Sequence, residues 1–259
     1  MNYWQERDAK AQEKLTNKSI KQTEAQLRKY YKTSFQRSLD NFEKVYNKIL
    51  QDTVKGKDIT PADLYKLDKY WQLQGELKVE LQKLGDRQVA LLSKQFEEQY
   101  IKIYESIALK GDDVFHQMDR AQAKQMINRI WCADGKSWSQ RVWTNTDKLQ
   151  QALNEELINC LLAGEKTTGL KKRLMREFNV AYSRADSIVR TEMAHLQTQA
   201  AQERYRDYGI SEVEVLVDGD ERTCDICSGL KGKKFPINGT MPVPAHPRCR
   251  CCIVPVVKE

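Results

Sequence analysis

Glycine and proline are scarce in this chain, whose 259 residues include 12 of the first and 6 of the second. A β-sandwich or β-barrel needs many tight turns, and such turns draw on these two residues. The scarcity therefore favours long helices. The sequence also lacks an apolar run of about 18 residues, the length that indicates a membrane-spanning helix. We therefore expect no transmembrane segment.

The opening residues, MNYWQERDAK, lack the apolar core of a secretory signal. This absence favours a protein that is made and kept in a reducing cytoplasm. The chain has 7 cysteines, and in that compartment clustered cysteines favour metal binding over disulfides.

The common enzyme signatures are missing as well. No P-loop, dinucleotide-binding fingerprint or His-Glu-x2-His motif is present. The zinc deaminase signature places His-x-Glu upstream of Pro-Cys-x2-Cys, and no His-x-Glu occurs here. With 3 histidines in the chain, a catalytic centre built on histidine is hard to assemble. No enzyme class therefore has a recognisable signature in this sequence.

The net charge of +7 is unevenly spread along the chain. Residues 1–60 carry 13 basic and 8 acidic side chains, and residues 165–209 carry 9 and 6. Residues 61–164, with 14 and 15, and residues 210–259, with 7 and 7, are nearly neutral. A local basic excess favours contact with an anionic partner. Because acidic residues are interleaved throughout, a solvated helix face explains the same pattern.

Residues 4–50 carry apolar side chains in steps of mostly three, four and seven, which predicts one long amphipathic helix. These positions are Ile20, Leu27, Tyr31, Phe35, Leu39, Phe42, Tyr46 and Ile49. The segment KGKDITP ends this helix. Thr60, Pro61 and Asp63 then form the N-cap, first position and capping box of the next one.

The second apolar pattern extends from Leu64 to Ile107. Gly75 and Gly85 are candidate bends in it, and Gly111 is a candidate stop. We expect the two long helices to pack as an antiparallel pair, with their aromatic side chains in the core.

The middle of the chain is also predicted to be helical, over residues 113–131, 147–162, 167–177 and 182–207. The tryptophans Trp131, Trp138 and Trp143 surround an Asp-Gly turn, and we expect them to fill a corner where helices meet. Arg190 and Glu192 face different ways on a helix, which favours ion pairing over a joint catalytic role. His195 is expected to be a packing or surface residue.

The character of the sequence changes at Ser211. SEVEVLV alternates as a strand should, and KKFPI and CCIVPVV are further short strand candidates. The predicted fold is mainly α, with long amphipathic helices, a helical core and a small C-terminal α+β or β module. The predicted domains are residues 1–111, 112–209 and 210–259.

The last module contains a cluster of potential metal ligands. Cys224-x2-Cys227 is followed, after 18 residues, by His246-x2-Cys249-x-Cys251. Cys-x2-Cys is the usual half of a structural zinc site, and a second pair completes a closed tetrahedron. A module of about 50 residues buries little apolar surface and often needs such a staple. We therefore predict structural Zn²⁺, with either Cys249 or Cys251 as the fourth ligand.

The other cysteines and nearby acidic residues receive simpler interpretations. Cys252 is expected to be a core cysteine on the opposite face of a strand from Cys251, and Cys132 and Cys160 to be buried and inert in helices. The acidic residues around the first cysteine pair are expected to form a turn that faces water; they are Asp218, Asp220, Glu221 and Asp225.

Several segments resemble one family of tailed-phage proteins. DGDERTCDICSGLKGKKFPI and MPVPAHPRCRCCIVP resemble the C-terminal signature of the phage Mu F-like minor head proteins. WCADGKSWSQRVWTN and RADSIVRTEMAHLQTQA resemble the helical core of that family, so the resemblance covers about residues 131–257. Its metal-site candidates correspond to Cys224, Cys227, His246, Cys249 and Cys251.

The resemblance implies a minor capsid protein that acts in head morphogenesis. It would be made in the host bacterial cytoplasm and packaged in the virion, inside the head or at the portal vertex, and would act in head assembly or DNA ejection. The implied partners are the portal protein and other phage head proteins, with possible non-specific contact to packaged DNA. The resemblance thus implies a virion component and not an enzyme, and it implies no catalytic residue.

Two alternatives remain open from the sequence. In the first alternative, residues 210–259 are a dedicated DNA-binding module, but their neutral charge argues against this role. In the second, they are part of a metal-dependent hydrolase. The hydrolase would use Asp218, Asp220 and His246 around an open metal position.

Overall fold

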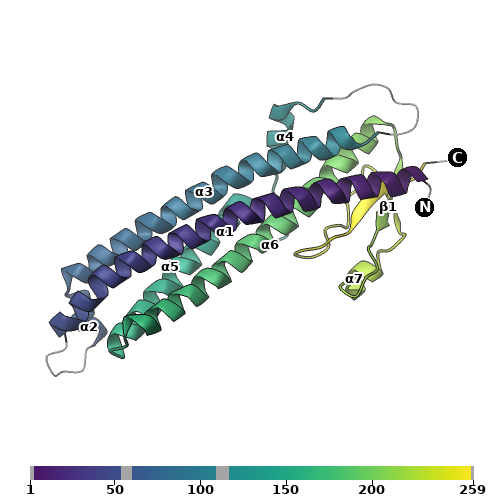
Figure 1. Cartoon of the computed structure of the whole chain (residues 1–259). Coiled ribbons are helices and arrows are strands. Elements are labelled where there is room, and N and C mark those ends of the chain that lie inside the picture. Colours follow the sequence, from purple (N-terminus) through teal and green to yellow (C-terminus); the bar gives the residue numbers. More distant parts are fainter. Residues whose placement is uncertain (1–2, 54–59, 109–116, 258–259) are drawn as a thin grey trace. The chain divides into compact units, whose positions relative to one another are not determined.

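The structure, a computed structural model, describes residues 3–53, 60–108 and 117–257. Helices dominate these residues, and a small antiparallel sheet lies near the C-terminus (Figure 1). The helices are α1 (Tyr3–Thr53), α2 (Pro61–Tyr65), α3 (Asp68–Ser106), α4 (Arg120–Ile127), α5 (Trp138–Leu162), α6 (Thr167–Asp207) and α7 (Asp225–Ser228). The strands are β1 (Glu212–Leu216), β2 (Lys234–Pro236) and β3 (Cys252–Pro255). The predicted fold class is confirmed.

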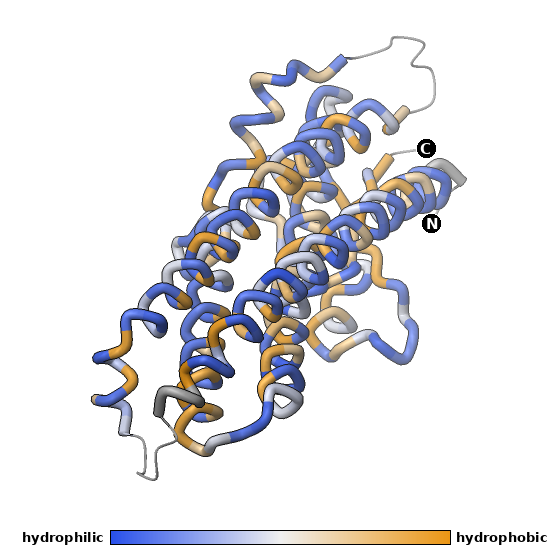
Figure 2. Tube along the Cα trace, turned by 60° about the vertical axis from the view of Figure 1, so that its left-hand side comes forward, coloured by the Kyte–Doolittle hydropathy of each residue, from blue (hydrophilic) through white to orange (hydrophobic). Residues whose placement is uncertain are grey.

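No helix among the described residues combines the length and the apolar character that crossing a membrane requires. Apolar positions instead recur at intervals along the long helices, with polar ones between them (Figure 2). This is the pattern of helices that bury one face in a protein core.

The chain forms two compact units, each built from segments distant in sequence. Unit 1 comprises Met1–Glu24, Leu91–Trp138 and Ser187–Glu259, and unit 2 comprises Ala25–Ala90 and Ser139–Asp186. The division into domains at residues 111 and 209 remains a prediction about which segments fold by themselves.

Within unit 2, α1 and α3 pack antiparallel, as predicted. The Tyr31 hydroxyl donates to Gln88 Oε1 at 3.1 Å, and Arg37 lies 3.6 Å from the Glu80 carboxylate. Residue numbers therefore fall along α3 as they rise along α1. The core of this unit contains fully buried aromatic and aliphatic side chains, among them Phe42.

The start of α2 confirms the predicted capping box. The backbone N–H of Asp63 donates to Thr60 Oγ1 at 3.4 Å, and the backbone N–H of Thr60 donates to Asp63 Oδ2 at 3.2 Å. The single helix predicted up to Ile107 is wrong in one respect, because it is interrupted between Tyr65 and Asp68. The predicted stop at Gly111 lies outside the described residues.

Gly75 and Gly85 both lie inside α3. A Cβ atom at Gly85 would lie 2.3 Å from Trp143, whereas one at Gly75 would meet nothing within 4 Å. Gly85 therefore permits a close approach of the Trp143 ring.

Three helix predictions in the middle of the chain need correction. The helix predicted for 113–131 is observed only over α4, with Asp119 as its N-cap; residues 113–116 are not among the described ones. Helix α5 begins at Trp138 and not at 147. The helices predicted for 167–177 and 182–207 are one continuous helix, α6, because buried Phe178 and Ala181 continue its apolar face through the predicted break.

The three tryptophans do not share one corner. In unit 1, Trp131 stacks on His195 with ring centroids 4.0 Å apart, and Trp138 meets Phe96 edge to face at 5.3 Å. Trp143 packs on Gly85 in unit 2.

The three predicted strands are confirmed and form one sheet in unit 1, in the order β2-β1-β3. Both pairings are antiparallel, and Val213 lies opposite Phe235 on one side and Pro255 on the other. Val213, Val215 and Ile253 are fully buried. The sheet thereby fixes the chain on both sides of the cysteine-rich loops.

Candidate metal centre

Cys224 and Cys227 are placed by the short helix α7. Cys224 is the N-cap of this helix, and its Sγ accepts a hydrogen bond from the backbone N–H of Cys227 at 3.5 Å. The half-turn between the two residues brings both sulfurs to the same side of the loop. Cys227 is buried, and Cys224 is partly exposed.

His246 faces this cysteine pair. Its Nδ1 lies 2.9 Å from the Pro247 carbonyl oxygen. Because a carbonyl oxygen only accepts, Nδ1 carries the proton, and in the neutral imidazole Nε2 presents its lone pair. Nε2 lies 3.3 Å from Cys224 Sγ and 3.1 Å from Cys227 Sγ. A backbone carbonyl that fixes the tautomer in this way is the usual support of a metal-ligating histidine.

Cys249 and Cys251 approach from the loop that leads into β3. Cys249 Sγ lies 3.7 Å from Cys227 Sγ, and the backbone N–H of Cys249 donates to the His246 carbonyl at 3.1 Å. Both cysteines are buried. The ligand atoms therefore form two triads that share Cys227: one with Cys224 and His246, and one with Cys249 and Cys251, each with its atoms within 4.8 Å of one another.

Three distances in this cluster are close to the edges of a zinc tetrahedron, although no four of the ligand atoms lie within 4.8 Å of one another. With Zn–S bonds of about 2.3 Å and Zn–N bonds of about 2.0 Å, two sulfurs lie about 3.8 Å apart and a sulfur and a nitrogen about 3.5 Å apart. The Cys227–Cys249 separation of 3.7 Å matches the first value, and the two sulfur–nitrogen separations of 3.1 and 3.3 Å are slightly below the second. The donor set, thiols with one neutral imidazole nitrogen, also suits this metal.

The local environment shifts the pKa values of the thiols in opposite directions. The backbone N–H of Cys227 lowers the pKa of Cys224, and burial raises the pKa of Cys227 to about 11. Cys251, beside Cys249, lowers the pKa of Cys249 to about 5, while its own pKa is raised by that neighbour. Cys249 is thus the thiol most ready to act as a thiolate ligand.

An arginine between two of the ligands ties the loops together. Arg250 contacts Asp218 at 2.7 Å and both carboxylate oxygens of Asp220 at 2.5 and 2.9 Å. Arg250 holds the pKa of Asp220 well below its usual range. Arg222 also donates to Asp220. The loop that precedes Cys224 is thereby joined to the segment of Cys249 and Cys251.

Side chains of helix α6 hold the loops next to the ligand cluster by hydrogen bonds to their backbone. The backbone N–H of Arg248, which has a positive φ of 63°, donates to Thr191 Oγ1 at 3.0 Å. Gln202 Nε2 donates to the carbonyls of Ile237 and Gly239 at 2.6 and 2.9 Å. Because these contacts join segments that are distant in the chain, no local sequence pattern could have identified Thr191 or Gln202 as supporting residues.

The structure corrects some of the sequence-based expectations about neighbouring residues and confirms others. Cys132 lies in a bend at intermediate exposure, outside any helix, whereas Cys160 is buried in α5 as expected. Cys252 belongs to neither ligand triad, but it is partly exposed and lines a pocket instead of the core. Asp218 and Asp220 are exposed, as expected, and they also pair with arginines.

The hydrolase arrangement has no support in this geometry. It needs Asp218, Asp220 and His246 around one metal position. Both carboxylates instead contact Arg250, and the imidazole of His246 faces Cys224 and Cys227.

The residues considered for catalysis on α6 have structural partners. Arg190 pairs with Glu24, as its assignment to ion pairing predicted. The Trp131 indole N–H donates to Glu192 at 2.9 Å. His195 is buried, and burial lowers its pKa to about 3, so this packing histidine stays neutral.

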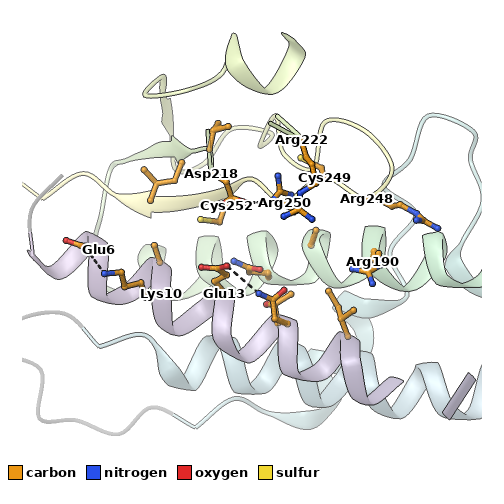
Figure 3. A pocket seen from close by; sticks show the side chains of 18 residues that line it. Glu6, Lys10, Glu13, Arg190, Asp218, Arg222, Arg248, Cys249, Arg250 and Cys252 are labelled. Carbon is orange, nitrogen blue, oxygen red and sulfur yellow. Dashed lines mark hydrogen bonds and ion pairs between the residues drawn. The ribbon is translucent and has the colours of Figure 1, made fainter. Parts of the chain in front are cut away.

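A pocket of about 900 Å³ lies beside the cluster in unit 1 (Figure 3). Residues of α1 form one wall, with Glu6, Lys10 and Glu13 among them. The opposite wall carries four arginines, from α6 and from the loops next to the metal-ligand cluster: Arg190, Arg222, Arg248 and Arg250.

Comparison with known proteins bears on the C-terminal part of the chain. The family model described as Phage Mu protein F like protein matches residues 151–254. This is a family of phage head morphogenesis and minor capsid proteins. The matched segment contains all of α6, strands β1 and β2, β3 up to Val254 and all five candidate ligands. No curated protein and no solved structure matches the chain.

Proposed function

We propose that this chain, in which residues 151–254 form a Phage Mu protein F like domain, is a minor capsid protein of a tailed bacteriophage or prophage. It acts in head assembly, DNA ejection or both, at the portal vertex or inside the head. The observation that carries the proposal is the family match, which confirms the resemblance drawn from the sequence and spans the whole ligand cluster.

A nonsense codon in the gene of this chain, in the phage or prophage that encodes it, tests the proposal. We expect the chain to be found by mass spectrometry in purified wild-type virions and the mutant to yield few infectious particles. Heads without DNA in electron micrographs would indicate a role in assembly, and filled heads that fail to deliver DNA a role in ejection. Absence of the chain from purified wild-type virions would contradict the proposal.

We further propose that the ligand cluster holds one structural Zn²⁺. The hydrogen bond from His246 Nδ1 to the Pro247 carbonyl and the short distances of His246 to Cys224 and Cys227, and of Cys227 to Cys249, support this metal. Bound zinc would contribute to the folding free energy of residues 210–257, whose apolar core is small. With four protein ligands the site is closed and has no position for a catalytic water.

Elemental mass spectrometry of the purified protein tests the zinc site. We expect about one zinc per chain, lost in Cys224→Ser and Cys227→Ser and retained in the control Cys160→Ser. Comparison of Cys249→Ser with Cys251→Ser identifies the fourth ligand, because only one of them is expected to abolish binding. A metal-free wild-type protein, purified without chelator, would contradict the proposal.

Contact with packaged DNA is a further part of the proposed function. The basic excess lies in residues 1–60 and 165–209, and residues 210–259 are neutral. Binding to phosphates through such an excess has no sequence specificity and weakens steeply with salt. DNA binding by the full chain that survives high salt would instead favour a dedicated DNA-binding module.

A further inference from the structure

The N-terminal part of α1, residues 3–24, differs from the remainder of the helix in what it buries. We call these residues the arm; they belong to unit 1. Every described side chain that the arm buries is polar: Gln5, Asp8, Gln12, Thr16, Ser19 and Thr23. In unit 2, residues 27–49 of the same helix bury mainly apolar side chains, among them Leu27, Leu39, Phe42, Tyr46 and Ile49.

The arm is held by hydrogen bonds to two parts of unit 1. Gln5 Nε2 donates to the Pro255 carbonyl of β3 at 2.8 Å. The Tyr205 hydroxyl of α6 donates to Asp8 Oδ2 at 3.1 Å and accepts from Gln12 Nε2 at 2.9 Å. The arm is thus attached to the edge strand and to α6 through polar groups.

The contact between the arm and α3 is polar too. Gln99 Nε2 donates to Thr16 Oγ1 at 2.7 Å. Gln99 Oε1 is buried without a hydrogen-bond partner among the described residues. The closed arrangement therefore leaves a polar atom unsatisfied, which favours opening.

A polar contact of this kind separates more easily than an apolar one. When the arm leaves, water replaces each lost hydrogen bond, so the net loss per bond is small. Separation of residues 27–49 from their neighbours would expose apolar surface to water, which is strongly unfavourable. Regions with few buried apolar contacts are the ones that open first in native proteins.

The arm also forms one wall of the pocket of about 900 Å³ (Figure 3). We propose that the arm opens as a unit: residues 3–24 detach while residues 27–49 of the same helix stay packed, and detachment removes the α1 wall of the pocket and separates Arg190 from Glu24. The arginines face the arm across the pocket, and Arg222, Arg248 and Arg250 are exposed in this arrangement.

Amide hydrogen exchange of the full chain, read by mass spectrometry, tests this proposal. We expect amides of residues 8–23 to exchange at least about tenfold faster than amides of residues 31–46, after correction for intrinsic rates. Equal protection of the two segments would overturn the proposal. The comparison lies within one helix of the natural protein and needs no variant.

A double variant tests the cause of the difference. Thr16→Val with Gln99→Met replaces both partners of a buried hydrogen bond by apolar groups of similar shape. We expect exchange of the arm to slow about fivefold in this variant. The matched control is Lys14→Ala with Lys21→Ala, which changes exposed positions of the arm and leaves its buried face intact. An arm that is no slower in the double variant, or is slowed equally by the control, would overturn the proposal.

Discussion

At the scale of single residues, Asp8 is a carboxylate with 3% of its surface exposed and the Tyr205 hydroxyl as a donor. Burial raises its pKa to about 6, against the opposing effects of Tyr205 and of the positive charge of Arg7. Because the folded state favours the protonated form, Asp8 adds stability at low pH. This contribution is lost as the pH rises from about 4 through 6.

We therefore expect Asp8→Asn to stabilise the protein at pH 7.5. Asparagine keeps an acceptor for Tyr205 and carries no charge. A pKa shift of about two units corresponds to about 3 kcal/mol, so the expected gain in unfolding free energy is about 1–3 kcal/mol. Urea unfolding at several pH values should show this gain shrink toward pH 4. The exposed Glu13→Gln on the same helix is the control, and equal stability of Asp8→Asn and wild type at pH 7.5 would contradict the assignment.

Arg250 supports the proposed metal centre through geometry as well as charge. Its planar guanidinium spans Asp218 and both oxygens of Asp220, which a lysine ammonium cannot do. We expect Arg250→Lys to release zinc to a chromogenic chelator about threefold to tenfold faster, with a stability loss of about 1 kcal/mol because the pair is partly exposed. The matched control Arg222→Lys, at a side chain 77% exposed, should leave the rate unchanged. Indistinguishable release rates for Arg250→Lys and wild type would argue against this role.

At the scale of elements, two glycines of α3 offer a matched pair. A Cβ at Gly85 would lie 2.3, 2.6 and 2.9 Å from ring atoms of Trp143, whereas a Cβ at Gly75 meets nothing. We expect Gly85→Ala to lose about 1–3 kcal/mol through overpacking and Gly75→Ala to gain about 0.5–1 kcal/mol through higher helix propensity. Thermal unfolding of both variants checks the opposite signs. A stable Gly85→Ala would mean that the ring has room to move.

Hydrophobic periodicity predicted α3 and the second part of α1, because both bury apolar residues at helical spacing. It predicted a helix from residue 4, but its apolar positions begin only at Ile20, and the residues that the arm buries, such as Gln12 and Thr23, are polar. It also suggested a break in α6 near Val180, a weak helix former, where packing of Phe178 and Ala181 keeps the helix continuous.

The candidate site was predictable as far as its ligands have a local pattern. The Cys-x2-Cys and His-x2-Cys spacings identified the residues that the structure brings together. The pairing of Arg250 with Asp218 and Asp220 was not predictable, because it joins separate loops. The sequence likewise gave no means to choose between Cys249 and Cys251, because both follow His246 within a few residues. The structure places both in the triad that contains Cys227.

At the scale of the whole molecule, all candidate ligands lie in unit 1. Unit 2 contains Cys160, buried in α5. Its core of helices depends on apolar side chains such as Phe42 and Leu153. Loss of metal is therefore expected to destabilise unit 1 and to leave unit 2 folded.

We expect chelation of the metal, or Cys224→Ser, to increase amide exchange over residues 210–257 and to leave residues 31–46 protected. The reason is that the small sheet buries few apolar side chains, so the metal ligands contribute much of its stability. Among the buried side chains are Val213, Val215, Ile253 and Val254. The control Cys160→Ser should keep both the metal and the protection of residues 210–257. A change that begins sharply at residue 210 would support the predicted domain boundary, and one that extends into α6 would show unit 1 to unfold as a whole. If the metal is lost and exchange over residues 210–257 stays the same, the sheet is stable by packing alone and the structural role proposed for zinc is wrong.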